Sequence, residues 1–280
     1  MTQLKNKIDF VAVISVTNAN ANGDPSNGNR PRTDYEGMGE ISDVCIKRKI
    51  RNRMQDFLPS GSVFVQSQDR ADDGAKSLKE RAKSLEKIKD VDEYVGTACK
   101  KWIDVRTFGQ VFAFKNNEIS SAGVRGPVSI HQAISTDPVE INSMKITKSV
   151  NSETKEGKSS DTMGMKHFVK FGLYKIKGSI NVQLAEKTGF SEEDAELVKK
   201  CLTTLFVNDS SSARPDGSME VVKLYWFKHN CKDGQYSSAE VHRSVNMHLK
   251  DGVNYPKSID DYEIFLNKLD GLEVEEIEGR

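Results

Sequence analysis

The sequence predicts an α+β fold in which an antiparallel sheet carries helices on one face. Stretches of alternating or β-branched residues, typical of strands, recur along the 280-residue chain. Two other segments, after Ser42 and after Ser191, carry apolar residues at helical spacing instead. The resulting order of strand, helix, strands, strand, helix and strand is typical of a ferredoxin-like or RRM core.

The first strand is predicted at residues 8–16, IDFVAVISV. A long loop follows, NANANGDPSNGNRPRTDYEGMG, which contains Arg30 and Arg32. Its Asn, Gly, Pro and Asp residues favour turns over a regular ladder. Loops of this length in compact domains are usually functional or disordered, so this segment is a candidate site.

A helix is predicted next, with Ser42 or Asp43 as its N-cap and Pro59-Ser60-Gly61 at its end. Its apolar stripe recurs at Ile46, Ile50, Met54 and Phe57. Lys47 and Arg51 lie four residues apart on a flank of this stripe, whereas Arg48 and Asn52 point further away. Backbone N–H groups at such a helix start favour an anion, although the basic run alone is equally well explained as a solvated helix face.

The rest of the chain alternates between sheet and helix. Residues 70–103 are mostly helix-forming, and about 60–103 is predicted to be a helical insertion. The polar stretch of about 141–166 predicts a β-hairpin. Ser191 caps a helix that begins EEDAELVKK. Strands are predicted at 105–114, 123–135, 168–183, 219–227, 261–266 and 273–277. We expect one domain over residues 1–280 that contains both insertions.

The composition describes a chain with no net charge and an uneven charge distribution. Residues 258–280 carry eight acids against Lys268 and Arg280, a charge of −6, so residues 1–257 carry +6. Such local fields can recruit phosphate even when the net charge is zero. Four dispersed cysteines predict buried thiols in a reducing cytoplasm, and the lack of a long apolar run predicts no membrane association.

The aspartates in and beside the glycine-rich loop are the residues with a possible catalytic role. The five histidines have no metal-binding spacing, and nucleophile or cofactor motifs are absent, so no metal, cofactor or catalytic residue is predicted. Asp24, Asp34 and Asp43 lie in or beside the glycine-rich loop, where an acid could promote RNA cleavage. The competing interpretation makes Asp24 and Asp34 turn formers and Asp43 a helix cap.

A family resemblance rests on an ordered set of strings. SVTNANANGDPSNGNRPRTD and ISDVCIKRKIRN are followed by VRTFGQVFAF, RGPVSIHQAISTDPV, MGMKHFVKFGLY, TGFSEED and LYWFKHN. Together they strongly resemble the backbone subunit of CRISPR Cascade complexes of subtype I-C, in the RAMP superfamily. The acidic C-terminal tail and the segment of about 60–100 lack such strings.

The resemblance implies a hand-shaped protein with an RRM-like palm, a helical finger region and a hairpin thumb. Several copies would polymerise along one guide RNA (crRNA), each thumb bending the guide so that target DNA pairs in short segments. Other Cascade subunits would be partners, and a recruited helicase–nuclease would cut the DNA. By position in the matching motifs, the resemblance assigns guide contacts to Ser42, Lys47, Arg51, Arg30, Arg32, Arg48, Met163, Lys166 and His167.

Three functions therefore compete at this point. The leading hypothesis is a non-catalytic RNA-binding filament subunit. The alternative is an RNA endonuclease that uses Asp24 or Asp34, because backbone subunits of other CRISPR types use a loop aspartate. A metabolic enzyme on an α+β scaffold is the third, and the absence of a recognisable nucleophile, metal set or cofactor loop speaks against it.

Overall fold

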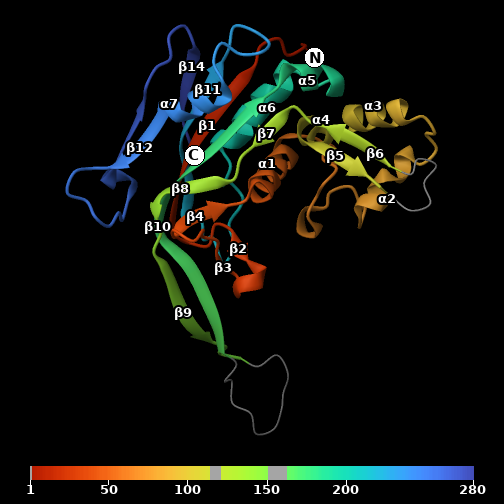
Figure 1. Ribbon diagram of the computed structural model, residues 1–280. Coiled ribbons are helices and arrows are strands. Elements are labelled where there is room, and N and C mark those ends of the chain that lie inside the picture. Colours follow the sequence, from red (N-terminus) through yellow and green to blue (C-terminus); the bar gives the residue numbers. More distant parts are fainter. Residues whose placement is uncertain (1, 114–120, 151–162) are drawn as a thin grey trace, which may run out of the picture.

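A mixed α+β fold built on one large antiparallel sheet is observed in the computed structural model, which describes residues 2–113, 121–150 and 163–280 (Figure 1). Within these residues the sheet has eight strands, with the order β14-β11-β1-β10-β8-β4, while β7 and β9 also pair with β10. The strands are β1 (Ile8–Ala19), β4 (Met38–Ile41), β7 (Val128–Ile130), β8 (Ala133–Pro138), β9 (Ile141–Thr147), β10 (Met163–Ile180), β11 (Met219–Lys228) and β14 (Glu273–Glu278). The predicted fold class is confirmed.

Strand β1 lies at the centre of this sheet and is buried on both faces. It pairs antiparallel with β10 and with β11, so that Ile8 lies opposite both Ile180 and Lys228. Phe10 and Ile14 point into one apolar cluster, whereas Val11 and Val13 point into another. Alternating apolar residues on both sides explain why the whole segment reads as one hydrophobic run.

Three helices cover the first face: α1 (Asp43–Phe57), α5 (Val182–Thr188) and α6 (Glu192–Thr203). The stripe predicted for α1 is buried at Ile46, Ile50 and Met54. Helix α6 begins with the expected cap, because the Ser191 hydroxyl accepts the Asp194 N–H and the Asp194 carboxylate accepts the Ser191 N–H.

The second face is also covered, which corrects the expectation of helices on one face only. Helix α7 (Ser238–Ser244) and the separate ribbon of β12 (Val245–Leu249) and β13 (Tyr262–Leu266) pack over it. Helices α5 and α7 were missed because each has seven residues, too few for a clear 3.6-residue pattern. A buried hydrogen bond from His242 Nε2 to the Gly178 carbonyl, 2.9 Å long, joins α7 to β10.

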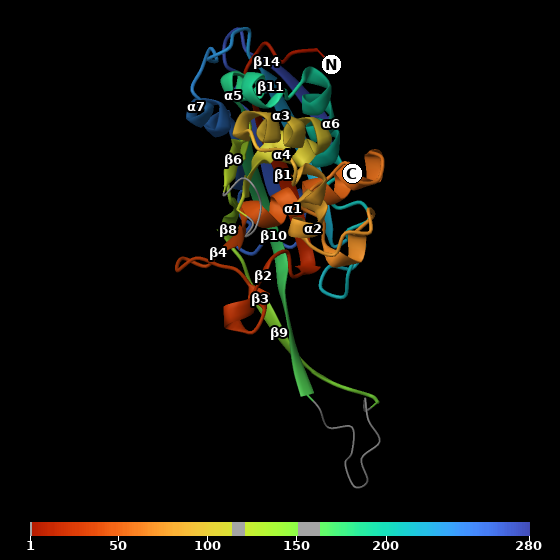
Figure 2. The ribbon, with the colours of Figure 1, turned by 90° about the vertical axis from the view of Figure 1, so that its right-hand side faces the viewer.

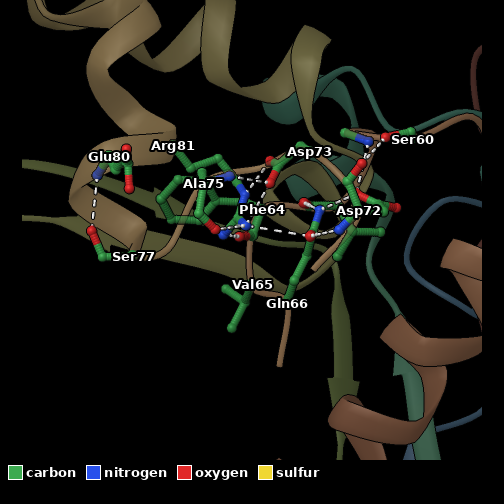
Figure 3. A network of polar contacts seen from close by, with 12 residues as sticks. Ser60, Phe64, Val65, Gln66, Asp72, Asp73, Ala75, Ser77, Glu80 and Arg81 are labelled. Atoms are coloured by element: carbon green, nitrogen blue, oxygen red, sulfur yellow. Dashed lines mark hydrogen bonds and ion pairs between the residues drawn. The ribbon is translucent and has the colours of Figure 1, made fainter. Parts of the chain in front are cut away.

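A second small core lies beside the sheet, on the right of Figure 1. Its elements are α2 (Leu78–Ala82), η3 (Lys83–Leu85), α3 (Val91–Lys101), α4 (Ile103–Phe108), β5 (Gly109–Phe112) and β6 (Ala122–Arg125), preceded by η2 (Gln68–Arg70). Phe64, Trp102 and Phe112 pack against one another there. The buried Arg81 guanidinium orders the preceding loop by donating to the Asp73 carboxylate and the Phe64 carbonyl (Figure 3).

Two strand predictions in this region were wrong in detail. The strand expected at 105–114 begins as the last turn of α4, and only Gly109–Phe112 is extended, while residue 114 lies outside the described residues. Five of the six α4 residues are buried, so no amphipathic period marks the helix. The strand expected at 123–135 is divided into β6, β7 and β8, and Pro127, which lacks an N–H donor, lies at the first break.

A two-stranded ribbon projects from the sheet (Figures 1 and 2). It consists of β9 and the first part of β10, paired from Met163 with Thr147 to Val169 with Ile141. Residues 151–162 of the hairpin expected at about 141–166 lie outside the described residues. Among the described helices, none is long and apolar enough to cross a membrane.

Candidate functional site

The glycine-rich loop folds back against the start of α1. Two short strands, β2 (Gly23–Asp24) and β3 (Arg30–Pro31), flank the 3-10 turn η1 (Pro25–Asn27). The side-chain oxygen of Asn22 accepts the Ser42 N–H at 2.9 Å, which fixes the loop to the helix N-terminus. The loop therefore borders the first turn of α1.

The first turn of α1 is capped by Ser42, which decides between the two predicted caps. The Ser42 hydroxyl accepts the Cys45 N–H at 3.3 Å, and Asp43 is the first residue of the helix. The helix dipole and the remaining N–H groups make this 15-residue helix favourable to an anion at this end.

Lys47 and Arg32 supply positive charge beside this turn. The Lys47 ammonium lies 3.0 Å from the Asp43 carboxylate on the same helix. Arg32 lies 3.4 Å from the Asp24 carboxylate, and its buried Nε has no hydrogen-bond partner among the described residues. Arg30, in β3, is half-buried. Lys47 and Arg32 are held by exposed or half-buried carboxylates, so both remain available to a stronger anionic ligand.

Arg51 and Arg48, on the same helix, face the second core instead. Arg51 Nε donates to Asp104 at 2.9 Å, and its guanidinium lies 4.9 Å from the centre of the Phe108 ring. Arg48 donates to the Val65 carbonyl at 2.7 Å, and burial lowers the pKa of its guanidinium. Both side chains therefore tie α1 to the second core, a role that the sequence pattern did not predict.

The structure also brings a distant loop to α1. Lys49 is 4% exposed and pairs with Asp209, whose carboxylate lies 3.2 Å from Arg214. The Asn20 N–H donates to the Ala213 carbonyl at 2.9 Å, which holds this loop against the glycine-rich segment. Arg214 is a candidate site residue that the sequence analysis missed, because no spacing rule links residues so far apart.

The remaining predicted residues lie on the projecting ribbon, away from α1 (Figure 1). The Met163 side chain is 56% exposed, and Lys166 and His167 are half-buried. The His167 Nδ1 lies 2.8 Å from the Ser143 hydroxyl on the paired strand. The predicted residues thus form three groups. Ser42, Lys47, Arg30 and Arg32 lie at the loop-to-helix junction, Arg48 and Arg51 face the second core, and Met163, Lys166 and His167 lie on the ribbon.

Comparison with known proteins identifies the family. The family model "CRISPR-associated protein Cas7" matches residues 6–267. The chain belongs to the CRISPR-associated protein Cas7 family. A CRISPR-associated protein Cas7 of Haloferax volcanii is 25% identical over 232 residues, which are 76% of this chain and 67% of that protein.

Solved structures extend the likeness to the fold. A chain of a "CRISPR RNA-guided surveillance complex, pre-nicking" is 16% identical, with a TM-score of 0.52, and the match covers 84% of this chain and 79% of that one. A chain of a "CRISPR RNA-guided surveillance complex" is 17% identical, with a TM-score of 0.47, and covers 89% and 78%. At this identity the first match shows a shared fold.

The loop aspartates of this Cas7-family chain have local partners. Asp24 accepts the Ser26 N–H at 3.1 Å, and Asp34 accepts the Glu36 and Met38 N–H groups at 2.9 and 2.8 Å. These are the turn-forming contacts that the competing interpretation expected. In the part of the chain that the structure describes, no three acids, histidines or cysteines gather as a metal site. The Cas7 family comprises backbone proteins that are generally non-catalytic.

Proposed function

We propose that this chain is a non-catalytic, guide-RNA-binding backbone subunit of a type I-C CRISPR Cascade complex. The observation that carries the proposal is the loop-to-helix junction, where the capped N-terminus of α1 lies beside Arg32 and Lys47. The family match and the surveillance complex whose chain shares this fold support the same class of function.

The junction suits phosphates rather than bases. Helix N–H groups, the Ser42 hydroxyl and the Lys47 ammonium would contact the backbone oxygens of a strand without regard to its sequence. That is what a protein needs when guide pairing supplies the sequence readout. Arg30 and Arg32 would assist, whereas Arg48 and Arg51 would add charge through the guanidinium nitrogens that their internal contacts leave free.

The ribbon of β9 and β10 would act as a thumb. A two-stranded ribbon is marginal alone, and this one exposes Met144, Ile146, Met163 and Met165. Apolar side chains exposed on a projecting element indicate a partner that covers them. We propose that the guide covers this surface, with Lys166 and His167 near its phosphates. We also propose that residues 1–280 form one palm domain, with the thumb at about 141–166 and a helical finger insertion at about 60–103.

The proposal includes the assembly that the resemblance implied. Copies of the chain would polymerise along the crRNA beside other Cascade subunits in the cytoplasm. Target DNA would pair with the guide, and a recruited helicase–nuclease would cut it. No cofactor is required for this role, because base pairing and phosphate contacts carry it.

The test is binding of the purified protein to a repeat–spacer RNA over a salt series. The variant Arg30→Ala/Lys47→Ala should bind more weakly, and the slope of log K against log salt should shrink by about 1.4, since each lost contact to a single strand removes about 0.7. Lys187→Ala, an exposed lysine of α5, is the matched control and should leave the slope unchanged. An unchanged slope in the double variant would remove the junction from the site.

A further inference from the structure

A pocket lies on the second face of the sheet, opposite the α1 side. Its volume is about 280 Å³, and it is lined by Ile134, Ser135, Thr136, Lys175, Lys177 and Met247. Lys175 and Lys177 stand two residues apart on β10, opposite Val13 and Val11 of β1, which point into the apolar cluster of that face. The pocket thus places two like charges at the margin of an apolar layer.

Neither lysine has an anionic partner in the described part of the chain. The Lys175 ammonium donates to the Val245 carbonyl at 2.5 Å. Burial and the charge of Lys177 lower the pKa of Lys175. A half-buried ammonium that is bonded only to a carbonyl and is repelled by a second ammonium is poorly compensated, so an anion in the pocket would stabilise both lysines.

The surrounding groups do not supply that anion. The His131 N–H donates to the Lys177 carbonyl, and the His131 ring lies 5.6 Å from that of His242, so further nitrogens border the lysines. Asp9 lies on the same face, but its Oδ2 is bound by His229 at 2.8 Å and by Lys7 at 3.2 Å, and its Oδ1 lies 3.9 Å from the His242 ring. On β8, the Asp137 carboxylate accepts the Tyr262 hydroxyl at 2.9 Å. Among the described residues, then, no carboxylate is bonded to Lys175 or Lys177, which leaves the pocket open to an anionic group from another molecule.

The other end of the sheet carries the opposite charge. β14 is the edge strand and contains Glu273, Glu275, Glu276 and Glu278. Glu275 pairs with Lys199 at 2.8 Å, and Glu276 and Glu278 share Lys223 at 3.5 and 3.1 Å, so the four glutamates still outnumber the lysines bound to them. The Glu278 side chain is 79% exposed. In the strand order, β14 lies at one end and the β10–β8 pair near the other (Figure 1).

We propose that the Lys175–Lys177 pocket receives the acidic β14 edge of the next copy of this chain, with the Glu278 carboxylate as its main ligand. A contact between two different surfaces of identical chains is heterologous and propagates as an open polymer. This inference rests on the proposed function, because it names the two surfaces through which neighbouring copies would meet in the proposed polymer. The carboxylate of a flexible glutamate can enter a recess between β8, β10 and β12, and the phosphate site proposed above lies on the opposite face.

The test reverses the charge of Lys177 and of Glu278, first separately and then together. On an RNA long enough for several copies, Lys177→Glu and Glu278→Lys should each raise the protein concentration needed for half-assembly by about tenfold, because like charges then meet at the interface. The variant with both substitutions should recover assembly, since every interface regains an opposite-charge pair. Lys223 keeps Glu276 in these variants, and Lys187→Glu controls for the change in net charge.

A second readout separates this proposal from the proposed function. Binding to an RNA that holds one copy should be unchanged in Lys177→Glu, and weaker binding there would assign the pocket to phosphate and overturn the inference. Zero-length carbodiimide cross-linking of concentrated wild-type protein should join Lys177 or Lys175 to β14 of another copy, with or without RNA. If wild type bound no RNA yet gave this cross-link, only the proposed function would fail. Absence of the cross-link, or no recovery in the double variant, would overturn the interface.

Discussion

Lys47 and Arg51 lie one turn apart on α1 and have different surroundings. Lys47 meets the Asp43 carboxylate at the surface, whereas Arg51 is 12% exposed and meets Asp104, which is fully buried. Asp104 also accepts the backbone N–H groups of Phe64 and Val65 at 2.6 and 3.0 Å. One carboxylate therefore satisfies three donors where the second core joins the first.

Replacing Asp104 tests this arrangement. Asp104→Ala should lower the free energy of unfolding by about 3–5 kcal/mol, because it leaves a nearly buried guanidinium and two N–H groups without their acceptor. Urea denaturation followed by circular dichroism measures the change. Asp216→Ala, in an exposed turn, should change stability by less than about 0.5 kcal/mol. A small loss for Asp104→Ala would mean that water replaces the carboxylate.

His242 predicts a pH dependence of stability. Burial lowers the pKa of His242 below the ordinary value of 6.5, although the Gly178 carbonyl and Asp9 oppose this. Between the two pKa values the unfolded chain binds more protons than the folded chain, so stability falls as the pH drops below about 6.5. His242→Gln, which keeps a donor for Gly178, should flatten the curve of unfolding free energy against pH. His248→Gln, on an exposed histidine paired with Glu263, is the control.

At the scale of elements, the pairing of β10 with β1 requires a glycine at position 178, which lies opposite Phe10. A Cβ atom on Gly178 would lie 2.2 Å from the Phe10 ring and 2.6 Å from the Ser129 carbonyl oxygen. Phe10 in turn stacks on Trp226 of β11, with ring centres 5.6 Å apart. The ring therefore has strands on both sides and little room to shift.

Gly178→Ala should accordingly destabilise the fold by about 1–3 kcal/mol through overpacking. Thermal unfolding should reveal the loss as a lower midpoint. Gly123→Ala in β6 is the matched control, because nothing lies within 4 Å of a Cβ atom built there. Equal midpoints for the two variants would show that Phe10 can move aside.

The elements that the sequence predicted well are those with long apolar patterns. Helices α1 and α6 carry a one-sided stripe, and their caps at Ser42 and Ser191 were recognisable from residue type, while the central strand β1 is a continuous apolar run. Helix α4 was mistaken for a strand because it is buried nearly all round and rich in residues that also suit strands. Short helices and broken strands depend on tertiary packing, which periodicity does not report.

At the scale of the whole molecule, the candidate site was predictable only where it is local. The glycine-rich loop and the first turns of α1 are adjacent in sequence, so Ser42 and Lys47 could be named. Arg214 reaches the same region through Asp209 and Lys49, and Arg51 is bound by Asp104. Contacts between residues so distant in sequence depend on how the strands and helices are arranged, and no local pattern in a single sequence reveals them.

The central position of β1 has a consequence for synthesis of the chain. Its partners β10 and β11 are both translated much later, since Ala19 pairs with Val169 and Ile8 with Ile180. At about 5–20 residues per second, the ribosome needs roughly 8–32 s to complete β10 after β1 has been made. During that interval IDFVAVISV leaves the exit tunnel with no strand to pair with. The nascent chain, more than the finished protein, is therefore the species that needs protection from aggregation.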